Sequence, residues 1–434
     1  MLMFTTIEEA LAYIHSRPKF HRENKLTLMK QALALFDNPQ DTFPSIHVTG
    51  TNGKGSVSHL ISELLVAHGY QVGLFTSPFI LRFNERIQLN NQQIGDVDLL
   101  KLVNQVKTKL DAADLTLTEF ELDTVLMFVY FAQQQIDVGV IEVGIGGEHD
   151  RTNVIEAMIG VIVSIGLDHE QIIGPTLADI AQEKAGIIKK KQTTILGDLP
   201  ESTRAIITDK LTEKSATGLW LGQQLQLTKV KISAGTANFS LKGPADLQLD
   251  HLQMPAFADW QVTDASLAIV AATEFLQKQQ TTLAVPILRR VLSKFNVAGR
   301  MELLSREPLI MIDGAHNINA ITALIAGVKR SFANKQVYLT MGMMADKDIA
   351  QVADLLAKTN WQVTWTTIPN SARAASEADL RQVLGESISY TSTWQEALQQ
   401  AITASGGDGL YLFAGSFYLI TDVRHFLLAT EADN

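Results

Sequence analysis

Residues 46–56 combine the groups that a phosphate-binding loop needs, because they read Ile-His-Val-Thr-Gly-Thr-Asn-Gly-Lys-Gly-Ser. An apolar strand runs into a turn with three glycines, one lysine and a hydroxyl, and the amphipathic stretch 56–68 then begins a helix. Glycines let N–H groups point at an anion, the lysine adds a point charge, and the helix N-terminus adds its dipole. A strict Walker A motif would instead require Gly at Val48 and Ser or Thr at Gly55. We interpret the segment as a phosphate cradle formed by Asn52, Gly53, Lys54, Gly55 and Ser56.

Three polar side chains lie where other strands of this region end. Ser77 follows the apolar run 72–76, Glu142 lies in the run 138–143, and His169 follows the run 161–165. Since ligands bind at the carboxyl ends of parallel strands, we expect the three near the cradle, where they suit a magnesium site completed by water and ATP oxygens. Plainer interpretations stay open: a structural salt bridge for Glu142, and a capping or core-rim position for His169.

Several charged residues farther along the chain are ambiguous on spacing alone. Lys184 ends an amphipathic helix that begins near Thr176, and a solvated lysine is the plain interpretation. The segment 313–317 reads Asp-Gly-Ala-His-Asn after a strand and opens a helix, while Arg300 lies in a linker. A structural cap or a solvated charge explains the last two features as well as a ligand contact does.

The elements that position these residues alternate between strands and helices from residue 48 to residue 197. Strand-like runs at 72–76, 138–143, 161–165 and 194–196 alternate with helical periodicity at 99–110, 119–134 and 177–187. This pattern predicts a mostly parallel α/β sheet covered by helices. Residues 219–250 alternate instead like short antiparallel strands with glycine at the turns, which predicts a small β-rich appendage.

A second α/β series begins near residue 309. Strands at 309–312, 337–341, 361–367 and 410–414 alternate with helices at 320–332, 349–358, 377–384 and 394–404. Only the first series opens with a phosphate loop. We therefore predict a P-loop-containing domain over residues 1–296, with the appendage, followed by a smaller Rossmann-like α/β domain over residues 297–434.

Bulk composition restricts the classes of function. The chain has 434 residues, of which 46% are hydrophobic and 19% charged, as in an ordinary globular protein. A net charge of −10 argues against a nonspecific nucleic-acid or membrane-surface binder. The absence of cysteine excludes disulfides and thiolate metal sites. The N-terminus lacks a visible secretion signal and the longest apolar run, 158–167, is too short to span a membrane, so we expect a cytoplasmic protein. We also expect a monomer.

Taken together, these motifs resemble the folylpolyglutamate synthase and dihydrofolate synthase family, within the Mur-ligase-like amide ligases. The resemblance runs through nearly the whole chain, and its order and spacing are highly specific. It rests on 49–56 (TGTNGKGS), 76–78 with 82–87 (RFNERI), 120–121, 142–147 (EVGIGG) with Asp150 and Asn153, 167–170 (LDHE), 174 with 183–188 (EKAGII), 299–300, 313–317 (DGAHN), 346–348 and 415–416.

The resemblance implies a role for each matching residue. It implies that Asn52–Ser56 hold the ATP phosphates, that Arg300 and Asp313 contact ATP, and that two Mg²⁺ ions bind. The metal ligands would be Ser77, Glu142, His169 and Lys184, with Lys184 carbamylated so that it becomes a carboxylate-like ligand of the second ion. Phe120 and Glu121 would belong to the folate pocket, and His316 and Ser416 would lie near the incoming glutamate. Lys54, Lys184 and His316 would thus serve catalysis.

Three positions depart from the family pattern. Phe79 stands where histidine is often found, and Asp264 replaces the adenine-side asparagine, although its carboxylate can accept a bond from the adenine amine. Glu148 stands where bifunctional members often carry arginine, which disfavours dihydropteroate as a substrate.

We therefore expect a folylpolyglutamate synthase: an ATP-dependent ligase that adds L-glutamate to the γ-carboxylate of a reduced folate through an acyl phosphate, with the second domain closing over ATP. Dihydrofolate synthase, alone or in a bifunctional enzyme, is the alternative within the same class. A non-catalytic nucleotide-binding switch is the alternative from another class, but it would need neither Lys184 nor the 313–317 segment.

Overall fold

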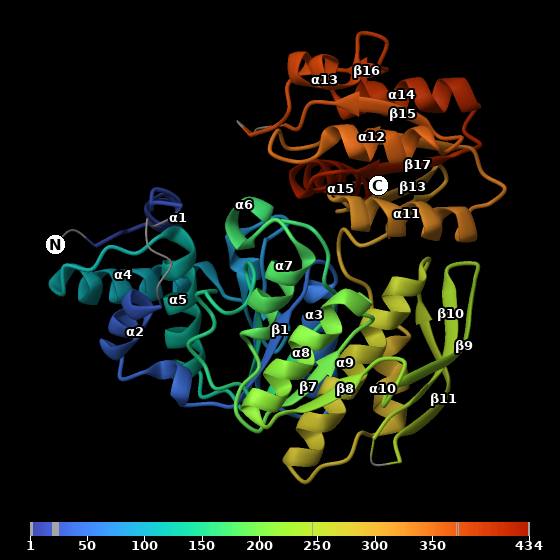
Figure 1. The fold of residues 1–434 in the computed structure, drawn as a ribbon. Helices are drawn as coiled ribbons and strands as arrows, with labels where there is room; N and C mark the ends of the chain where they lie inside the picture. The colour runs from blue at the N-terminus through green and yellow to red at the C-terminus, as the bar shows by residue number, and fades with distance from the viewer. Residues whose placement is uncertain (1–2, 20–25, 245, 370, 372, 433–434) are drawn as a thin grey trace. The chain divides into compact units, whose positions relative to one another are not determined.

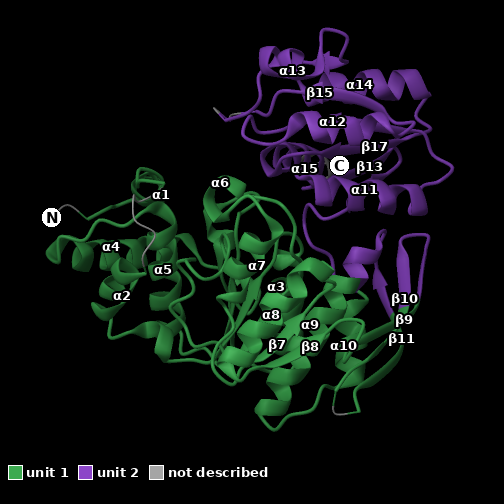
Figure 2. Cartoon of the chain, in the orientation of Figure 1, with its two compact units in different colours: residues 1–229, 239–252, 263–293 green, residues 230–238, 253–262, 294–434 purple. Residues whose placement is uncertain are grey.

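The computed structural model describes residues 3–19, 26–244, 246–369, 371 and 373–432 (Figure 1). The chain forms two compact units, coloured separately in Figure 2. Unit 1 comprises Met1–Lys229, Phe239–Leu252 and Thr263–Ser293, and unit 2 comprises Val230–Asn238, Gln253–Val262 and Lys294–Asn434. This division differs from the expected boundary at 296/297, because segments 230–238 and 253–262 group with the C-terminal residues. One reason lies in unit 2 itself, where the rings of Phe257 and Phe332 stack at 5.4 Å.

Unit 1 is built on an eight-stranded sheet of order β4-β3-β2-β5-β1-β6-β7-β8. The six strands from β2 to β8 in this order are parallel, and β3 and β4 form an antiparallel edge. The central strands are buried along their whole length, which explains their continuous apolar runs. The strands are β1 Ser45–Thr49, β2 Val72–Phe75, β3 Ile87–Leu89, β4 Gln92–Gln93, β5 Val138–Glu142, β6 Ile159–Ile162, β7 Thr193–Leu196 and β8 Thr217–Trp220.

Helices flank this sheet, and capping boxes begin two of those that matter for the site. Thr118 and Glu121 cap α5, and Thr176 and Asp179 cap α7. The helices α1, α2, α4 and α5 pack together around one hydrophobic cluster (Figure 1). The helices are α1 Ile7–His15, α2 Thr27–Ala34, η1 Pro39–Asp41, α3 Lys54–Ala67, η2 Phe83–Arg86, α4 Asp96–Ala112, α5 Glu119–Gln133, α6 Glu170–Ile173, α7 Leu177–Ala185, α8 Glu201–Lys214, α9 Asp259–Lys278 and α10 Val285–Leu292.

The β-rich appendage is a three-stranded sheet of order β11-β10-β9, formed by β9 Gln226–Ser233, β10 Thr236–Lys242 and β11 Gln248–Pro255. Its bounds differ from the expected 219–250 at both ends. Leu219 and Trp220 are the two buried residues of β8, which pairs in parallel with β7 at the edge of the main sheet. A third strand, β11, extends the appendage to Pro255.

Unit 2 contains a six-stranded sheet of order β12-β13-β17-β14-β15-β16, parallel except for β12. The prediction of a mostly parallel P-loop domain and a second, Rossmann-like α/β domain is therefore confirmed, although β12, β16 and α15 were not predicted. The elements are β12 Glu302–Arg306, β13 Leu309–Asp313, α11 Ile318–Ser331, β14 Val337–Met341, α12 Ile349–Ala357, β15 Gln362–Thr366, α13 Glu377–Leu384, β16 Tyr390–Thr391, α14 Trp394–Ser405, β17 Leu410–Ala414 and α15 Phe417–Ala432. In the described part of the chain, no helix is long and apolar enough to cross a membrane.

Candidate active site

The phosphate loop connects the central strand β1 to α3, as the sequence predicted. Gly53 precedes the helix with φ of 85°, a left-handed conformation that favours glycine. Ser164, in the segment after β6, fastens the loop: its hydroxyl accepts from the Asn52 N–H and donates to the Asn52 carbonyl, both at 2.9 Å. The Ser56 hydroxyl is buried and has no hydrogen-bond partner among the described residues. A buried hydroxyl without a partner at the start of a helix suits an anion or a metal-bound ligand.

Lys54 and Asp264 border this loop. The Lys54 ammonium donates to the Gly50 carbonyl at 2.9 Å, so in this structure its charge lies over the loop's own carbonyl oxygens. A Cβ added at Gly53 would come within 2.7 Å of an Asp264 carboxylate oxygen and within 2.7 Å of Val163. Asp264, the residue that departs from the family's asparagine, therefore lies directly against the phosphate loop.

Ser77 and Glu142 are brought together at the carboxyl edge of the sheet. The Ser77 N–H donates to Glu142 Oε2 at 3.1 Å. Glu142 is buried and also lies beside α3, because a Cβ on Gly55 would be 3.7 Å from its Oε2. Magnesium typically takes few protein ligands and keeps waters and phosphate oxygens. A buried carboxylate, a neighbouring serine and the unpartnered Ser56 hydroxyl beside a phosphate loop fit such an ion.

His169 lies at the same edge of the sheet but in a different environment. It is exposed and precedes α6 with φ of 53°. The sequence predicted it close to Glu142, which at this edge accepts from the Ser77 N–H. Its role as a metal ligand stays a prediction.

Lys184 is buried, with an exposed fraction of 3%, in the last turn of α7. The interpretation of this residue as a solvated lysine is therefore wrong. Burial and, to a smaller extent, the positive charge of Lys54 lower the pKa of Lys184 to about 7, while the charges of Asp168, Asp150 and Glu183 oppose the shift. A lysine of lowered pKa beside the phosphate loop is a candidate for chemistry rather than for solubility.

The turn that follows β5 packs against the end of α7. A Cβ on Gly147 would lie 2.4 Å from the Glu183 carbonyl and 3.0 Å from the Lys184 Cα, so only glycine permits this approach. Asp150 holds the turn by accepting from the N–H groups of Ile145 at 2.9 Å and Thr152 at 3.0 Å. The sequence suggested Asp150 only as part of a motif, and Ser164 not at all.

The two residues predicted for the folate pocket have different surroundings. Phe120 is partly buried, with its ring 6.0 Å from that of Phe75. Glu121 is buried, and its carboxylate accepts from the Thr118 N–H at 2.8 Å and pairs with Arg151 at 3.0 Å. Glu121 therefore caps α5 and fixes Arg151, which accounts structurally for its place in the motif.

In unit 2, the segment around β13 forms a second candidate site. Asp313, the last residue of β13, is buried and accepts from the N–H groups of Met301 and Ala315, each at 2.8 Å. Burial raises the pKa of Asp313, while the charge of Arg300 and the two backbone donors oppose that rise. The charge of Arg300 thus acts on Asp313, and the assignment of both residues to ATP stays a prediction.

His316 and Ser416 follow neighbouring strands. β13 and β17 are parallel, with Asp313 opposite Ala414, and each strand leads into a helix N-terminus. Ser416 is buried, and its hydroxyl accepts from the Tyr418 N–H at 3.3 Å. His316 Nδ1 is 2.8 Å from the Gly314 carbonyl. Because a carbonyl only accepts, Nδ1 carries the hydrogen, and Nε2 of the neutral ring is the acceptor.

Phe417 joins these groups, and the sequence did not suggest it. The Arg300 guanidinium carbon lies 4.8 Å from the Phe417 ring centroid, and the His316 ring lies 6.2 Å from it. A Cβ on Gly314 would meet the same ring at 2.6 Å. An aromatic residue directly after the Gly-Ser that follows β17 was the available signal.

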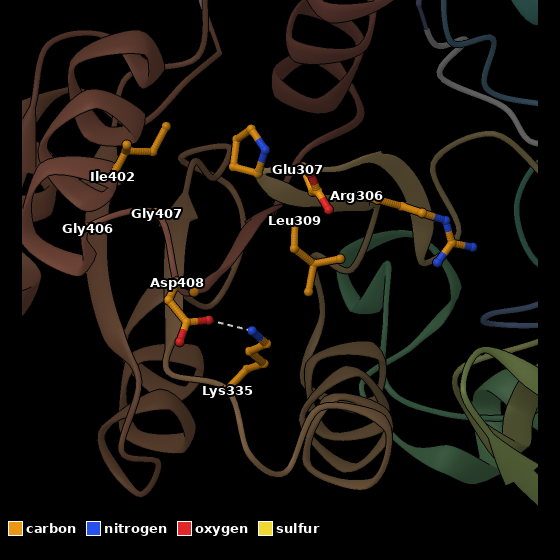
Figure 3. Close-up of a pocket in the computed structure, with 10 residues that line it drawn as sticks. Arg306, Glu307, Leu309, Lys335, Ile402, Gly406, Gly407 and Asp408 are labelled. Carbon is orange, nitrogen blue, oxygen red and sulfur yellow. Dashed lines mark hydrogen bonds and ion pairs between the residues drawn. The ribbon is translucent and has the colours of Figure 1, made fainter.

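A shallow hollow in unit 2 lies away from these residues (Figure 3). It is lined by 306–309, by Ile402, by 406–409 and by Lys335, which pairs with Asp408. Residues 309 and 410 begin the strands β13 and β17, so the hollow lies at the amino-terminal ends of these strands. Asp313 lies at the carboxyl end of β13. We assign it no part in the site.

The two α/β units and their strand-end polar groups define the class of protein. Residues 48–272 match the Mur ligase middle domain, and residues 299–417 match the Mur ligase glutamate ligase domain. The chain thus has the domain architecture of the Mur-type ligases.

Relatives of full length specify the family within this class. Folylpolyglutamate synthase of Lacticaseibacillus casei is 36% identical over 98% of this chain and 99% of its own length. Dihydrofolate synthase/folylpolyglutamate synthase of Bacillus subtilis is 33% identical over 97% and 99%. The solved apo form of the L. casei folylpolyglutamate synthase matches with a TM-score of 0.88 at 34% identity, over 98% of this chain and 100% of that one. The chain belongs to the folylpolyglutamate synthase/dihydrofolate synthase family.

Proposed function

We propose that this chain is a folylpolyglutamate synthase, an ATP-dependent ligase that joins L-glutamate to the γ-carboxylate of a reduced folate. The observation that carries the proposal is the buried Lys184, whose pKa is lowered by burial and by the charge of Lys54 in the phosphate loop. A solved folylpolyglutamate synthase–AMPPCP–folate complex matches the chain with a TM-score of 0.88 at 34% identity, which supports ATP and folate as substrates here.

A carboxylate is a poor electrophile, so the first step must activate it. An oxygen of the folate γ-carboxylate forms a bond to the γ-phosphorus of ATP, the bond to the ADP oxygen breaks, and an acyl phosphate results. In this step the backbone N–H groups of 52–56 and the Lys54 ammonium would bind the phosphates and offset the charge that develops on them. Arg300 and Asp313 would contact ATP from unit 2, and Asp264 would accept from the adenine amine.

The metal ligands that we propose are Ser77 and Glu142, with His169 from the neighbouring strand end. Magnesium held there would neutralise phosphate charge. We propose that Lys184 supplies a ligand for a second ion after carbamylation, in which its neutral amine adds to CO₂ and loses a proton. The lowered pKa of Lys184 favours this reaction, because only the neutral amine has the lone pair that attacks.

Glutamate enters in the second step. Its amine nitrogen attacks the acyl carbon, phosphate leaves, and the nitrogen loses a proton. His316 and Ser416 are the residues we propose for binding glutamate, since the accepting Nε2 of His316 suits an ammonium or amine and the start of α15 suits a carboxylate. Phe120 would contact the other substrate, the folate.

An ATP turnover assay with tetrahydrofolate monoglutamate and L-glutamate, each omitted in turn, tests this function. We expect ADP release to depend on the folate, and stable product to require glutamate as well. A nucleotide-binding switch would be indifferent to both compounds, and that result would contradict the proposal.

We predict that Glu142→Gln raises the magnesium concentration needed for half-maximal activity by at least ~10-fold and lowers turnover, because it removes a charged ligand but keeps the acceptor for the Ser77 N–H. His169→Ala should act in the same direction, and its exposed position makes a packing effect small. Magnesium titrations of the two variants measure this.

Glu121→Gln is the matched control: it should lower thermal stability without changing the magnesium requirement, since the Glu121 carboxylate accepts from Thr118 and pairs with Arg151. Unchanged titrations in both variants would assign Glu142 and His169 structural roles.

We predict that dihydropteroate is glutamylated more slowly than a reduced folate monoglutamate. Glu148 places a carboxylate where bifunctional members often carry arginine. The negative charge of Glu148 also acts on Lys189, whose pKa it raises against the effect of burial. Competition between the two substrates for limiting ATP measures the preference, and Glu148→Arg should shift it toward dihydropteroate. Equal turnover of both by the unmodified chain would instead favour the bifunctional alternative, whose name the B. subtilis relative carries.

The monomeric state, the cytoplasmic location and the absence of nucleic-acid or membrane partners remain predictions.

A further inference from the structure

Unit 1 contains a buried ion pair that the proposed mechanism does not use. Arg86 ends η2, and Asp123 lies in the second turn of α5. Asp123 is 1% exposed and the Arg86 side chain 12% exposed. The Arg86 Nε and Asp123 Oδ2 atoms are 3.6 Å apart, which is an electrostatic contact but too long for a hydrogen bond.

The pair has hydrogen-bonding capacity that the protein leaves unmet. Both carboxylate oxygens of Asp123, and Nε and Nη1 of Arg86, are buried without a hydrogen-bond partner in the part of the chain that the structure describes. Burying charges is costly unless hydrogen bonds satisfy them. Glu121 lies two residues earlier on α5, and its Oε1 atom is 3.0 Å from Arg151 Nε. The Glu121 carboxylate also accepts from the Thr118 N–H. The same helix can therefore satisfy a buried carboxylate, and at Asp123 it does not.

Two aromatic side chains lie beside the arginine of this pair. The Arg86 guanidinium carbon lies 5.2 Å from the Phe79 ring centroid and 5.9 Å from that of Phe83. Phe120 precedes Asp123 by three residues and so lies on the same side of α5. Phe120 is a residue that the sequence assigned to the folate pocket. The unmet polar groups of Asp123 therefore lie on the same side of α5 as this predicted folate contact.

The chemistry of the pair selects its ligand. Asp123 as a carboxylate can only accept hydrogen bonds, and Arg86 can only donate them. The ligand must therefore offer donors and an acceptor from one edge, and the aromatic surroundings favour a flat ring. A 2-amino-4-oxopyrimidine ring meets both conditions, because its ring N–H and amino group can donate to one carboxylate while its carbonyl accepts.

We propose that Arg86 and Asp123 recognise the 2-amino-4-oxopyrimidine edge of the pterin ring, with Asp123 binding the 2-amino group. The proposal rests on the proposed function, since it names the residues that read the folate substrate. It also replaces Glu121 by Asp123 as the carboxylate of α5 that contacts folate. Burial raises the pKa of Asp123 to about 7 against the opposing charge of Arg86, and donors on the ligand would offset this cost of burial.

The test compares tetrahydrofolate monoglutamate with its analogue in which a methyl group replaces the 2-amino group. The unmodified enzyme should prefer the amino form by at least ~10-fold in kcat/KM, because the methyl form leaves the buried carboxylate without its donor. In Asp123→Asn this preference should fall toward one, with the loss for the amino substrate appearing mainly in KM. Glu119→Gln is the matched control, since it removes a carboxylate one turn earlier on α5 that already pairs with His15 and Lys19. It should keep the preference.

Arg86→Lys keeps the positive charge but loses the planar fork of donors. It should weaken binding of both compounds while preserving the preference for the amino form. If Asp123→Asn retains the full preference, the pair is structural or holds only water, and the proposal is overturned. If the variants do not fold, the unmodified enzyme decides alone: equal kcat/KM for the two compounds overturns the proposal. Failure of the proposed function is distinguishable, because no glutamate would then be added to either compound.

Discussion

Lys54→Ala should abolish glutamate addition while the protein stays folded. The Lys54 ammonium is the one side-chain cation that the phosphate loop 50–56 carries, and we propose that it offsets charge on the transferred phosphoryl group. Losing such a contact costs on the order of 10²-fold or more in rate. Initial rates at saturating ATP, folate and glutamate measure the loss.

Two controls separate this effect from damage to the fold. The thermal unfolding midpoint of Lys54→Ala should stay close to that of the parent, because the side chain is half-buried at the first residue of α3 and donates to a carbonyl rather than packing in a core. Lys190→Ala, at an exposed lysine of the same unit, should leave the rate unchanged. Near-normal turnover by a folded Lys54→Ala enzyme would remove the phosphate assignment.

Lys184→Ala and Lys184→Arg should both inactivate the enzyme. Alanine removes the amine, and arginine keeps a positive charge but cannot become a carbamate. The pKa of about 7 means that a large fraction of Lys184 is neutral at physiological pH, whereas a free lysine of pKa ~10.4 would be almost fully charged. Acetate or formate should partly restore Lys184→Ala, because a small carboxylate can occupy the vacated ligand position.

A direct observation complements the rates. Enzyme equilibrated with ¹³C-labelled CO₂ should give a carbamate carbon signal that is absent in Lys184→Arg. Lys189→Ala is the matched control, since burial also lowers the pKa of Lys189 but its main charge partner is Glu156. That variant should keep both the signal and the activity. An active Lys184→Arg enzyme would show that the positive charge itself is needed, and the carbamate would then have no role.

Much of this architecture could be predicted from the chain, because local patterns determine it. Buried parallel strands need continuous apolar runs, and amphipathic helices need a period near 3.6 residues, so the strands β14 and β17 were predicted with the bounds that the structure has. The phosphate loop was equally readable, since its glycines, lysine and hydroxyl act through one short segment. Elements with weaker periodicity or little length, such as β12 and the two-residue β16, escaped prediction.

The partners of single charged residues could not be predicted in the same way. Glu121 and Asp123 stand two positions apart on one helix, yet one carboxylate meets Arg151 and a helix cap and the other meets Arg86 without a hydrogen bond. The cation that pairs with each carboxylate comes from a segment that is remote along the chain, so local patterns do not predict it. The same holds for Leu219 and Trp220, whose β-strand character was visible but whose pairing with β7 was not.

By itself, then, the sequence determined the fold class, the family and the phosphate loop, because these depend on short-range periodicity and on residue types at close spacing. The tertiary structure decided which ionisable groups are withdrawn from water. Lys184 is the clearest case: the sequence places a lysine at the end of an amphipathic helix, which reads as a solvated charge. In the folded chain the glycine turn 144–147 packs against that helix end and Lys184 is buried, and burial together with the charge of Lys54 brings its pKa near neutrality. Desolvation arises from atoms that only the folded chain brings together, and it is the main cause of the lowered pKa of this lysine.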